Sequence, residues 1–107
     1  MDKPLHELSI AEAGRRLRAG SLTARALTLD ALKRIEAIDP KINAFITVTR
    51  ERALADADAA DRDFARGVDR GPMQGVPHAL KDIYDTAGIR STCHSKLRVD
   101  NVPAEDS

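Results

Sequence analysis

The sequence has little of several features that small proteins use to fold or to bind ligands. It contains one cysteine, no tryptophan, and only 3% aromatic residues. The single thiol, Cys93, has no partner for an internal disulfide and no Cys or His at metal-ligand spacing, which indicates a reducing compartment without structural zinc. Because large aromatic side chains are scarce, we expect the core of this 107-residue chain to be incomplete alone.

Net charge and long apolar runs are missing as well. The 17 Lys and Arg residues balance the 17 Asp and Glu residues, so no overall field attracts nucleic acid or an anionic membrane. No segment approaches the ~20 consecutive apolar residues that span a bilayer. We therefore expect a cytoplasmic protein without a membrane partner and with no evident direct nucleic-acid partner.

Helix signals dominate the first part of the chain. Ser9, with a glutamate three residues later, fits a capping box, and Gly20 supplies the left-handed residue that ends many helices. Thr23 is the expected cap of a second helix, which Pro40 is expected to end. A third helix is predicted over Arg50–Arg66, with its acidic residues forming only a solvated face.

The later part of the chain predicts extended structure. Glycine and proline accumulate between residues 67 and 77 and mark a loop. Ala44–Thr49 alternates at period two, as a strand or an extended connector, and Val76–Tyr84 is predicted as a strand bounded by the turn Asp85–Gly88. Helices followed by a strand favour an α/β fold, with a helical segment over residues 1–66 and the start of an α/β core over residues 67–107.

An ordered series of short motifs lies between Gly71 and Lys96. It contains Gly75-Val76-Pro77, Lys81-Asp82, Thr86-Ala87-Gly88 and Ser91-Thr92-Cys93-His94-Ser95. This series resembles the amidase signature family, in which Gly-(Ile/Val)-Pro-x-x-x-Lys-Asp precedes a Thr-x-Gly turn and a Thr-Thr-x-Gly-Ser segment. Upstream, Asp39–Phe45 is similar to the family's Asp-Pro-x-x-Asn-Ala-Phe. His94 departs from the pattern, because the family usually has Gly or Ala at that position.

The resemblance implies a fold and an activity. The fold would be a mixed sheet with helices on both faces, and this chain would supply the N-terminal helices and the first strands. The activity would be hydrolysis of a carboxamide in a small-molecule substrate through a Ser-cisSer-Lys triad, with Lys81 as the catalytic base and without a metal or an organic cofactor. Implied partners are a second copy of the chain or the subunits of an amidotransferase.

A catalytic role for Lys81 makes a physical demand on its surroundings. With an ordinary pKa near 10.4, only about one lysine in 2,500 is neutral at pH 7. Burial can lower a lysine pKa by ~3–5 units, so we expect Lys81 to be buried on the predicted strand. Alternation along a strand would turn Asp82 to the opposite face, where it would be structural. Without the flanking motifs, a lysine is most often a solvated surface residue.

The nucleophile of the resembled family is not found in this sequence. The family places it in a Gly/Ser-rich segment, whereas the serines here are Ser9, Ser21, Ser91, Ser95 and Ser107. We therefore expect a fragment that carries the lysine of the triad and is inactive alone. Ser91, Thr92 and Ser95 are expected to form hydrogen bonds in a self-capping loop, and adjacent residues Cys93 and His94 lack the orienting third group of a thiol catalyst.

Two alternatives remain open at this point. The run Thr92–Lys96 resembles the glutaminase subunit, called the A subunit, of the tRNA-dependent amidotransferase, which belongs to the same family. The alternative from another class is a helical module that binds a partner through the apolar stripe of its second helix and catalyses nothing. That stripe consists of Ala24, Leu27, Ala31, Ile35 and Ile38.

Overall fold

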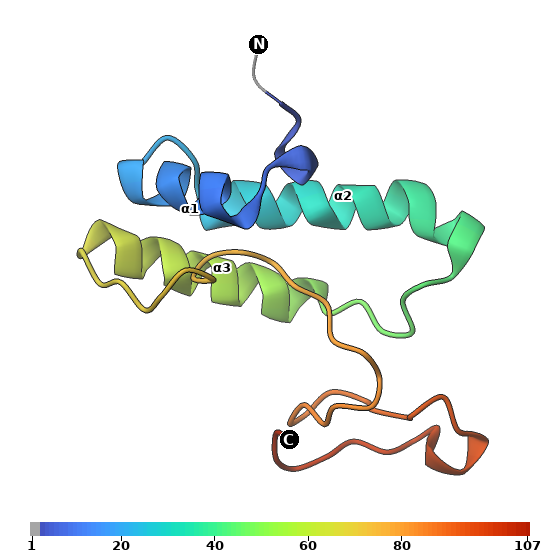
Figure 1. Cartoon of the computed structure of the whole chain (residues 1–107). Coiled ribbons are helices and arrows are strands. Elements are labelled where there is room, and N and C mark those ends of the chain that lie inside the picture. The colour runs from blue at the N-terminus through green and yellow to red at the C-terminus, as the bar shows by residue number, and fades with distance from the viewer. Residues whose placement is uncertain (1–2) are drawn as a thin grey trace. The chain divides into compact units, whose positions relative to one another are not determined.

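The computed structural model describes residues 3–107, which contain three α-helices and two short 3-10 helices. They are η1 (Leu5–Glu7), α1 (Ile10–Ala19), α2 (Ala24–Ile42), α3 (Arg50–Ala65) and η2 (Lys96–Arg98). The chain divides into a first unit, Met1–Pro77, and a second unit, His78–Ser107. Figure 1 shows that all three α-helices belong to the first unit. Over residues 3–107, no helix combines the length and the apolar character that crossing a bilayer requires.

The expected caps at both ends of α1 and at the start of α2 are confirmed. The Ser9 Oγ accepts a hydrogen bond from the Glu12 amide at 3.1 Å, and α1 ends at Gly20, whose φ is 81°. The Thr23 Oγ1 accepts from the Ala26 amide at 3.0 Å and so caps α2. Each cap satisfies an amide that has no partner inside the helix. The carboxylate of Glu12 pairs with two arginines of α1, so only this half of the capping box is found.

The end of α2 differs from the prediction, because the helix continues through Pro40 to Ile42. Proline removes one amide donor, which weakens a helix but does not by itself stop it. The chain leaves the helix at Asn43, whose φ is 51° and whose amide donates to the Asp39 carbonyl at 2.7 Å. The Asp39 carboxylate then accepts from the amides of the next two residues at 2.7 and 3.2 Å. Asp39 and Asn43 therefore set the end of α2.

Acidic residues of α3 bind the start of α2. The two helices pack against each other and run in opposite directions (Figure 1). The Asp61 carboxylate accepts from the amides of Ala24 and Arg25 at 2.7 and 3.1 Å, and Asp58 pairs with the Arg25 guanidinium at 2.9 Å. These carboxylates neutralise the positive end of the α2 dipole. The prediction that the acidic side of α3 is only a solvated face is therefore wrong.

The core of the first unit lies where the three helices meet. Leu17, Ala24 and Ala57 are buried there. The partly buried hydrophobic residues that pack against them are Leu22, Ala60, Phe64 and Val76. Three of these seven residues are alanine, as the low aromatic content predicts, so the helices approach one another closely around a small apolar centre.

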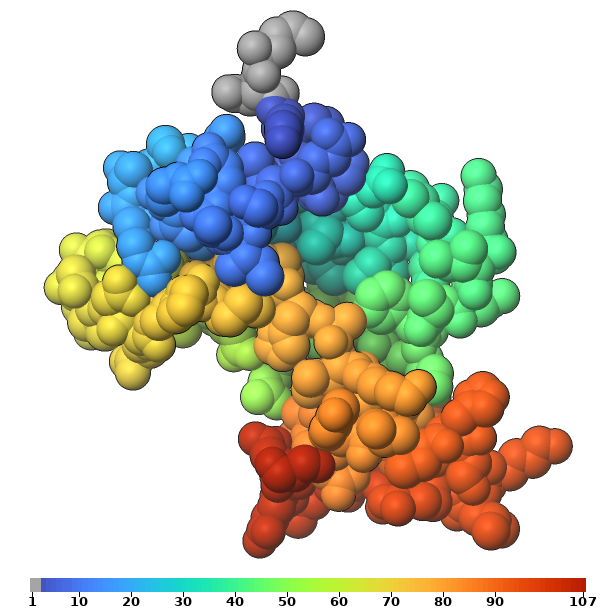
Figure 2. Space-filling model, in the orientation of Figure 1, coloured from blue at the N-terminus to red at the C-terminus, as the bar shows by residue number. Residues whose placement is uncertain are grey.

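The loop of residues 67–77 returns across α1 and closes this core. Figure 2 shows its yellow and orange atoms against the blue atoms of α1. The Arg18 guanidinium holds the loop by two hydrogen bonds to the Asp69 carboxylate and one to the Gly71 carbonyl, each 2.8 Å long. In this chain the loop belongs to the first unit. The expected domain boundary between residues 66 and 67 stays a prediction.

The predicted α/β fold is wrong for the described residues. Residues 3–107 contain helices and no β-strand, and the only pairing of this kind is an isolated bridge between Thr86 and Ile89. Both Val76–Tyr84 and Ala44–Thr49 are irregular, the latter as a connector between α2 and α3. A strand needs a neighbouring strand to satisfy its backbone groups. No segment of the described chain supplies one, so the expected mixed sheet is not found.

The second unit is built from turns joined by backbone hydrogen bonds. The Ile89 amide donates to the Thr86 carbonyl at 3.0 Å across a turn that contains Gly88, whose φ is 75°. Ser91 and Asn101 exchange two hydrogen bonds of 2.9 Å, which tie the C-terminal segment to the middle of the unit. The buried residues described in this unit are Ser91 and Thr92, which are 3% and 5% exposed. Its interior is therefore polar.

Candidate active site

Lys81 begins a tight turn in the second unit. The Tyr84 amide donates to the Lys81 carbonyl at 3.1 Å, which closes the turn over four residues. The Lys81 side chain is exposed, and among residues 3–107 it makes no ion pair. The burial that we expected is therefore not found, because the predicted strand is replaced by a turn. The catalytic role of Lys81 stays a prediction.

The neighbouring residue, Asp82, joins this turn to the loop Thr92–His94. Its carboxylate accepts from the Thr92 amide at 3.0 Å, from the Thr92 hydroxyl, and from the His94 amide at 3.4 Å. Its backbone carbonyl accepts from the Cys93 amide at 2.8 Å. One residue thus receives four hydrogen bonds from three consecutive residues of the loop. Asp82 has structural partners, as expected, but it reaches them from a turn and not from a strand.

These hydrogen bonds keep the Asp82 carboxylate ionised. The Thr92 hydroxyl is the main cause that holds the pKa of Asp82 below its usual value, followed by the Thr92 amide. The His94 amide and the positive charge of Arg90 act in the same direction, while partial burial opposes them. Donors that point at a carboxylate stabilise its charged form. The ionised carboxylate of Asp82 therefore faces the loop Thr92–His94.

The loop itself has an uncommon backbone conformation. Cys93 and His94 both lie in the left-handed region, with φ values of 52° and 56°. In this conformation the amides of Thr92 and His94 point at the Asp82 carboxylate, while the Cys93 amide between them donates to the Asp82 carbonyl. A histidine in this conformation has a steric cost. Glycine, one of the two residues usual at this position in the resembled family, adopts a positive φ without that cost. The Cys93 thiol is exposed.

The hydroxyl groups of the loop take part in local hydrogen bonds. The Ser91 hydroxyl donates to the Ile89 carbonyl at 3.2 Å, and the Ser95 Oγ accepts from the Leu97 amide at 3.2 Å. Together with the Thr92 hydroxyl, they form the self-capping loop that the sequence indicates. Within residues 3–107, no group of three or more His, Cys, Asp or Glu side chains is arranged to hold a metal ion.

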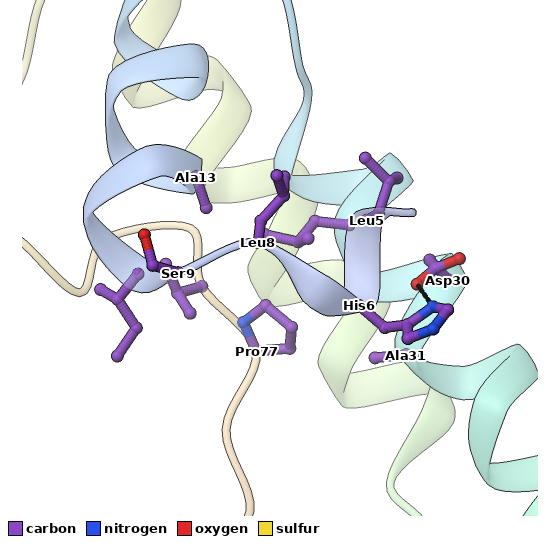
Figure 3. Close-up of a pocket in the computed structure, with 11 residues that line it drawn as sticks. Leu5, His6, Leu8, Ser9, Ala13, Asp30, Ala31 and Pro77 are labelled. Atoms are coloured by element: carbon purple, nitrogen blue, oxygen red, sulfur yellow. Dashed lines mark ion pairs between the residues drawn. The ribbon is translucent and has the colours of Figure 1, made fainter. Parts of the chain in front are cut away.

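A second feature, missed by the sequence analysis, is an open groove of about 300 Å³ in the first unit. Figure 3 shows His6 and Asp30 at one side of it and Pro77 at another. Its other lining residues are Leu5, Leu8, Ser9, Ile10, Ala13, Leu27, Ala31 and Val76. The His6 Nδ1 lies 3.5 Å from the Asp30 Oδ2, a buried oxygen that makes no hydrogen bond within the described residues. Apart from His6, Asp30 and Ser9, whose Oγ caps α1, the residues that line the groove are apolar.

The turn and loop around Lys81 lie within a region shared with known proteins. The model of the amidase family matches residues 26–107, which include all but the first two residues of α2, the whole of α3 and the whole second unit. That match covers more than half of the chain. The chain therefore belongs to the amidase family.

Similar proteins extend the match to nearly the whole chain. The chain is 52% identical over 102 residues to the A subunit of the glutamyl-tRNA(Gln) amidotransferase of Geobacter metallireducens, covering 95% of this chain and 21% of that protein. It is 52% identical over 93 residues to the protein of the same name from Thioalkalivibrio sulfidiphilus, covering 87% and 19%. The chain thus spans about a fifth of the length of these curated relatives.

A solved structure is similar in fold as well. It is a chain of an inhibitor-bound vestigial protein complex that reveals the evolutionary origins of an s-triazine catabolic enzyme. The TM-score is 0.86 at 36% sequence identity, over 92% of this chain and 22% of that chain. A similar fold therefore occurs within a much longer protein.

Proposed function

We propose that the full-length protein is an amidase-type hydrolase of carbon–nitrogen bonds in carboxamides, and that Lys81 is its catalytic base. The observation that carries this proposal is the turn of Lys81 and Asp82. The Asp82 carboxylate, next to the lysine, accepts hydrogen bonds from Thr92 and His94. Lys81 therefore has no ion-pair partner within residues 3–107 that would hold a proton on it.

The chemistry follows from a neutral lysine beside two serines. Lys81 accepts a proton from a bridging serine, which accepts the proton of a nucleophilic serine as that oxygen attacks the amide carbon. The C–N bond breaks, ammonia or an amine leaves with a proton, and water then hydrolyses the acyl-enzyme. Backbone amides stabilise the negative oxygen of the intermediate. We place both serines in the portion of the relatives' length that this chain does not cover.

The exposure of Lys81 requires a further component of this proposal. A lysine in water is almost entirely protonated at pH 7. We propose that other parts of the full-length protein, or the substrate itself, cover Lys81 and so favour its neutral form. The triad needs no metal or organic cofactor. The single thiol, which has no disulfide partner, and the similarity to amidotransferase A subunits support a cytoplasmic protein.

A second candidate is the glutaminase component of a tRNA-dependent amidotransferase. It is supported by the names of two relatives that are 52% identical to this chain. The small-molecule substrate would then be glutamine, and the partners would be the other amidotransferase subunits. An amidase outside such a complex would have a second copy of itself as its partner, or no partner. The family match counts against the third alternative, a helical module without catalysis.

The proposal is tested by ammonia release from glutamine and from a simple aliphatic amide. We expect Lys81→Ala in the full-length protein to lower kcat by on the order of 10³-fold or more, because the proton acceptor is lost. Lys81→Met, which keeps the bulk of the side chain, should be equally inactive. Lys33→Ala removes another exposed lysine, on α2, and should leave the rate unchanged.

The outcomes separate the candidates. Release from glutamine only with partner subunits present supports the glutaminase, and release from both amides without partners supports an amidase. The 107-residue chain alone should release no ammonia. Turnover by a Lys81→Ala protein at more than a tenth of the normal rate would show that Lys81 is not the base.

A further inference from the structure

The hydrogen bonds of Asp82 bear on Lys81 as well as on the loop. A carboxylate attached to the adjacent residue is close enough to attract the lysine ammonium if its oxygens are free. In this structure they are not free, because two amides and a hydroxyl donate to them. Thr92, which supplies two of these donors, is 5% exposed. Water therefore competes poorly for this contact.

The same contacts also hold the backbone of the turn that contains Lys81. Asp82 follows Lys81 directly in the turn closed by Tyr84, and its carbonyl is held by the Cys93 amide at 2.8 Å. A turn without such anchors would change its backbone angles freely. With four hydrogen bonds to one loop, the Cα of Lys81 is held at a defined place in the second unit.

We propose that Asp82 is a positioning residue for Lys81, which acts by fastening the lysine's turn to the loop Thr92–His94 and by directing its own charge into that loop. This inference rests on the proposed function only for its consequence in catalysis. Within residues 3–107, the arrangement leaves Lys81 without a neighbouring counter-ion. A base that must lose its proton readily needs this separation.

The Thr92 hydroxyl gives the sharpest test, because Thr92→Val removes the donor while keeping the shape of the side chain. The readout is the rate at which acetic anhydride acylates Lys81 at pH 8 in the full-length protein, measured by mass spectrometry relative to Lys33. We expect about a threefold lower rate in Thr92→Val, because a carboxylate released from the loop can pair with the ammonium form of the neighbouring lysine. Thr92→Ser keeps the hydroxyl and should match the unaltered protein.

Asp82→Asn separates charge from structure. It loosens the loop, because the NH2 group of the new side chain cannot accept hydrogen bonds, yet it brings no negative charge near the lysine. We expect the acylation rate of Lys81 to be no lower than in the unaltered protein, whereas kcat for amide hydrolysis falls about tenfold with KM nearly unchanged. A merely structural residue would give Asp82→Asn and Thr92→Val the same direction of change in acylation.

The two claims fail in different ways. Absence of amidase activity in the unaltered protein would contradict the proposed function and leave the acylation comparison intact. Equal acylation of Lys81 in all four proteins, including none in any of them, would overturn the inference about Asp82. So would equal behaviour of Thr92→Val and Thr92→Ser.

Discussion

The first and second units are stabilised by different kinds of contact. In the first unit, Leu17, Ala24 and Ala57 are buried between helices, and the loop of residues 67–77 packs onto them. In the second unit, the buried residues described are Ser91 and Thr92, and both make hydrogen bonds. Burial of apolar surface is non-directional, whereas hydrogen bonds fix orientation.

This difference assigns the two units different tasks. An apolar core between capped helices gives a scaffold whose stability depends little on the exact direction of each group. A polar unit places individual atoms at defined distances, which a catalytic residue such as the proposed base Lys81 requires. The chain also carries a separate probe for each unit. The α-helices report on the first unit by circular dichroism, and Tyr84, the single tyrosine in a chain without tryptophan, reports on the second by fluorescence.

The largest effect is expected from Gly75→Ala in the first unit. A Cβ at this position would lie 2.9 Å from Phe64 Cε2, 3.1 Å from Leu17 Cδ1 and 3.3 Å from the Ala24 Cβ, and the φ of Gly75 is 80°. Both overpacking and a left-handed backbone oppose the change, so we expect the free energy of unfolding to fall by about 3 kcal/mol. Urea unfolding of the 107-residue chain, followed at 222 nm, measures it.

Gly67→Ala is the matched control for that change. Its φ of 72° is similar, but a Cβ there would meet no atom within 4 Å. We expect a loss of about 1 kcal/mol, the cost of the backbone conformation alone. If Gly75→Ala shifts the Tyr84 transition as far as the helical one, the two units unfold together and the contrast drawn between them fails.

The features that the sequence predicted correctly depend on residues close together along the chain. The caps at Ser9 and Thr23 and the helix end at Gly20 involve contacts over three or four residues, so local pattern suffices. The motif around Lys81 was found in the same way, because its residues are close together in the sequence. Family membership followed from it.

The features that were missed depend on distant residues. The predicted strand over Val76–Tyr84 needed a partner strand that the described chain does not supply, so its apolar pattern was not enough. Asp61 is indistinguishable from its acidic neighbours in the sequence, yet it caps a helix that begins 37 residues earlier. The exposure of Lys81 was missed for the same reason, since burial is decided by what packs against a residue.

Acid should weaken the second unit through Asp82. The pKa of this carboxyl is lowered in the folded state by its hydrogen bonds with Thr92. The unfolded chain therefore binds the proton first, so the stabilisation is complete above the ordinary value of 3.8 and is lost as pH falls below it, through the lower folded value. We expect the amide resonances of Thr92 and His94 to move together below about pH 4.

Asp82→Asn is the control for this acid transition. The variant has no proton to bind at that position, so the resonances of Thr92 and His94 should no longer titrate together. The helices of the first unit also have carboxylates with lowered pKa values, Glu12 and Asp63. Their core residues are apolar and carry no charge that acid could change, so we expect the helical signal to persist to lower pH than the loop resonances. Loss of the helical signal at a higher pH than the loop resonances would contradict the contrast between the units.

The smallest effect is a gain in stability, expected from His94→Gly in the second unit. His94 has a φ of 56°, which costs an L-residue about 1–2 kcal/mol and a glycine nothing. Glycine gives back part of this gain through the larger backbone entropy of the unfolded chain, so we expect a net stabilisation of about 0.5 kcal/mol. The amide that donates to Thr92 and Asp82 is kept. His78→Gly, at a residue without a positive φ, should give no gain, and an equal shift of the Tyr84 transition in both variants would show that the backbone of this loop is not strained.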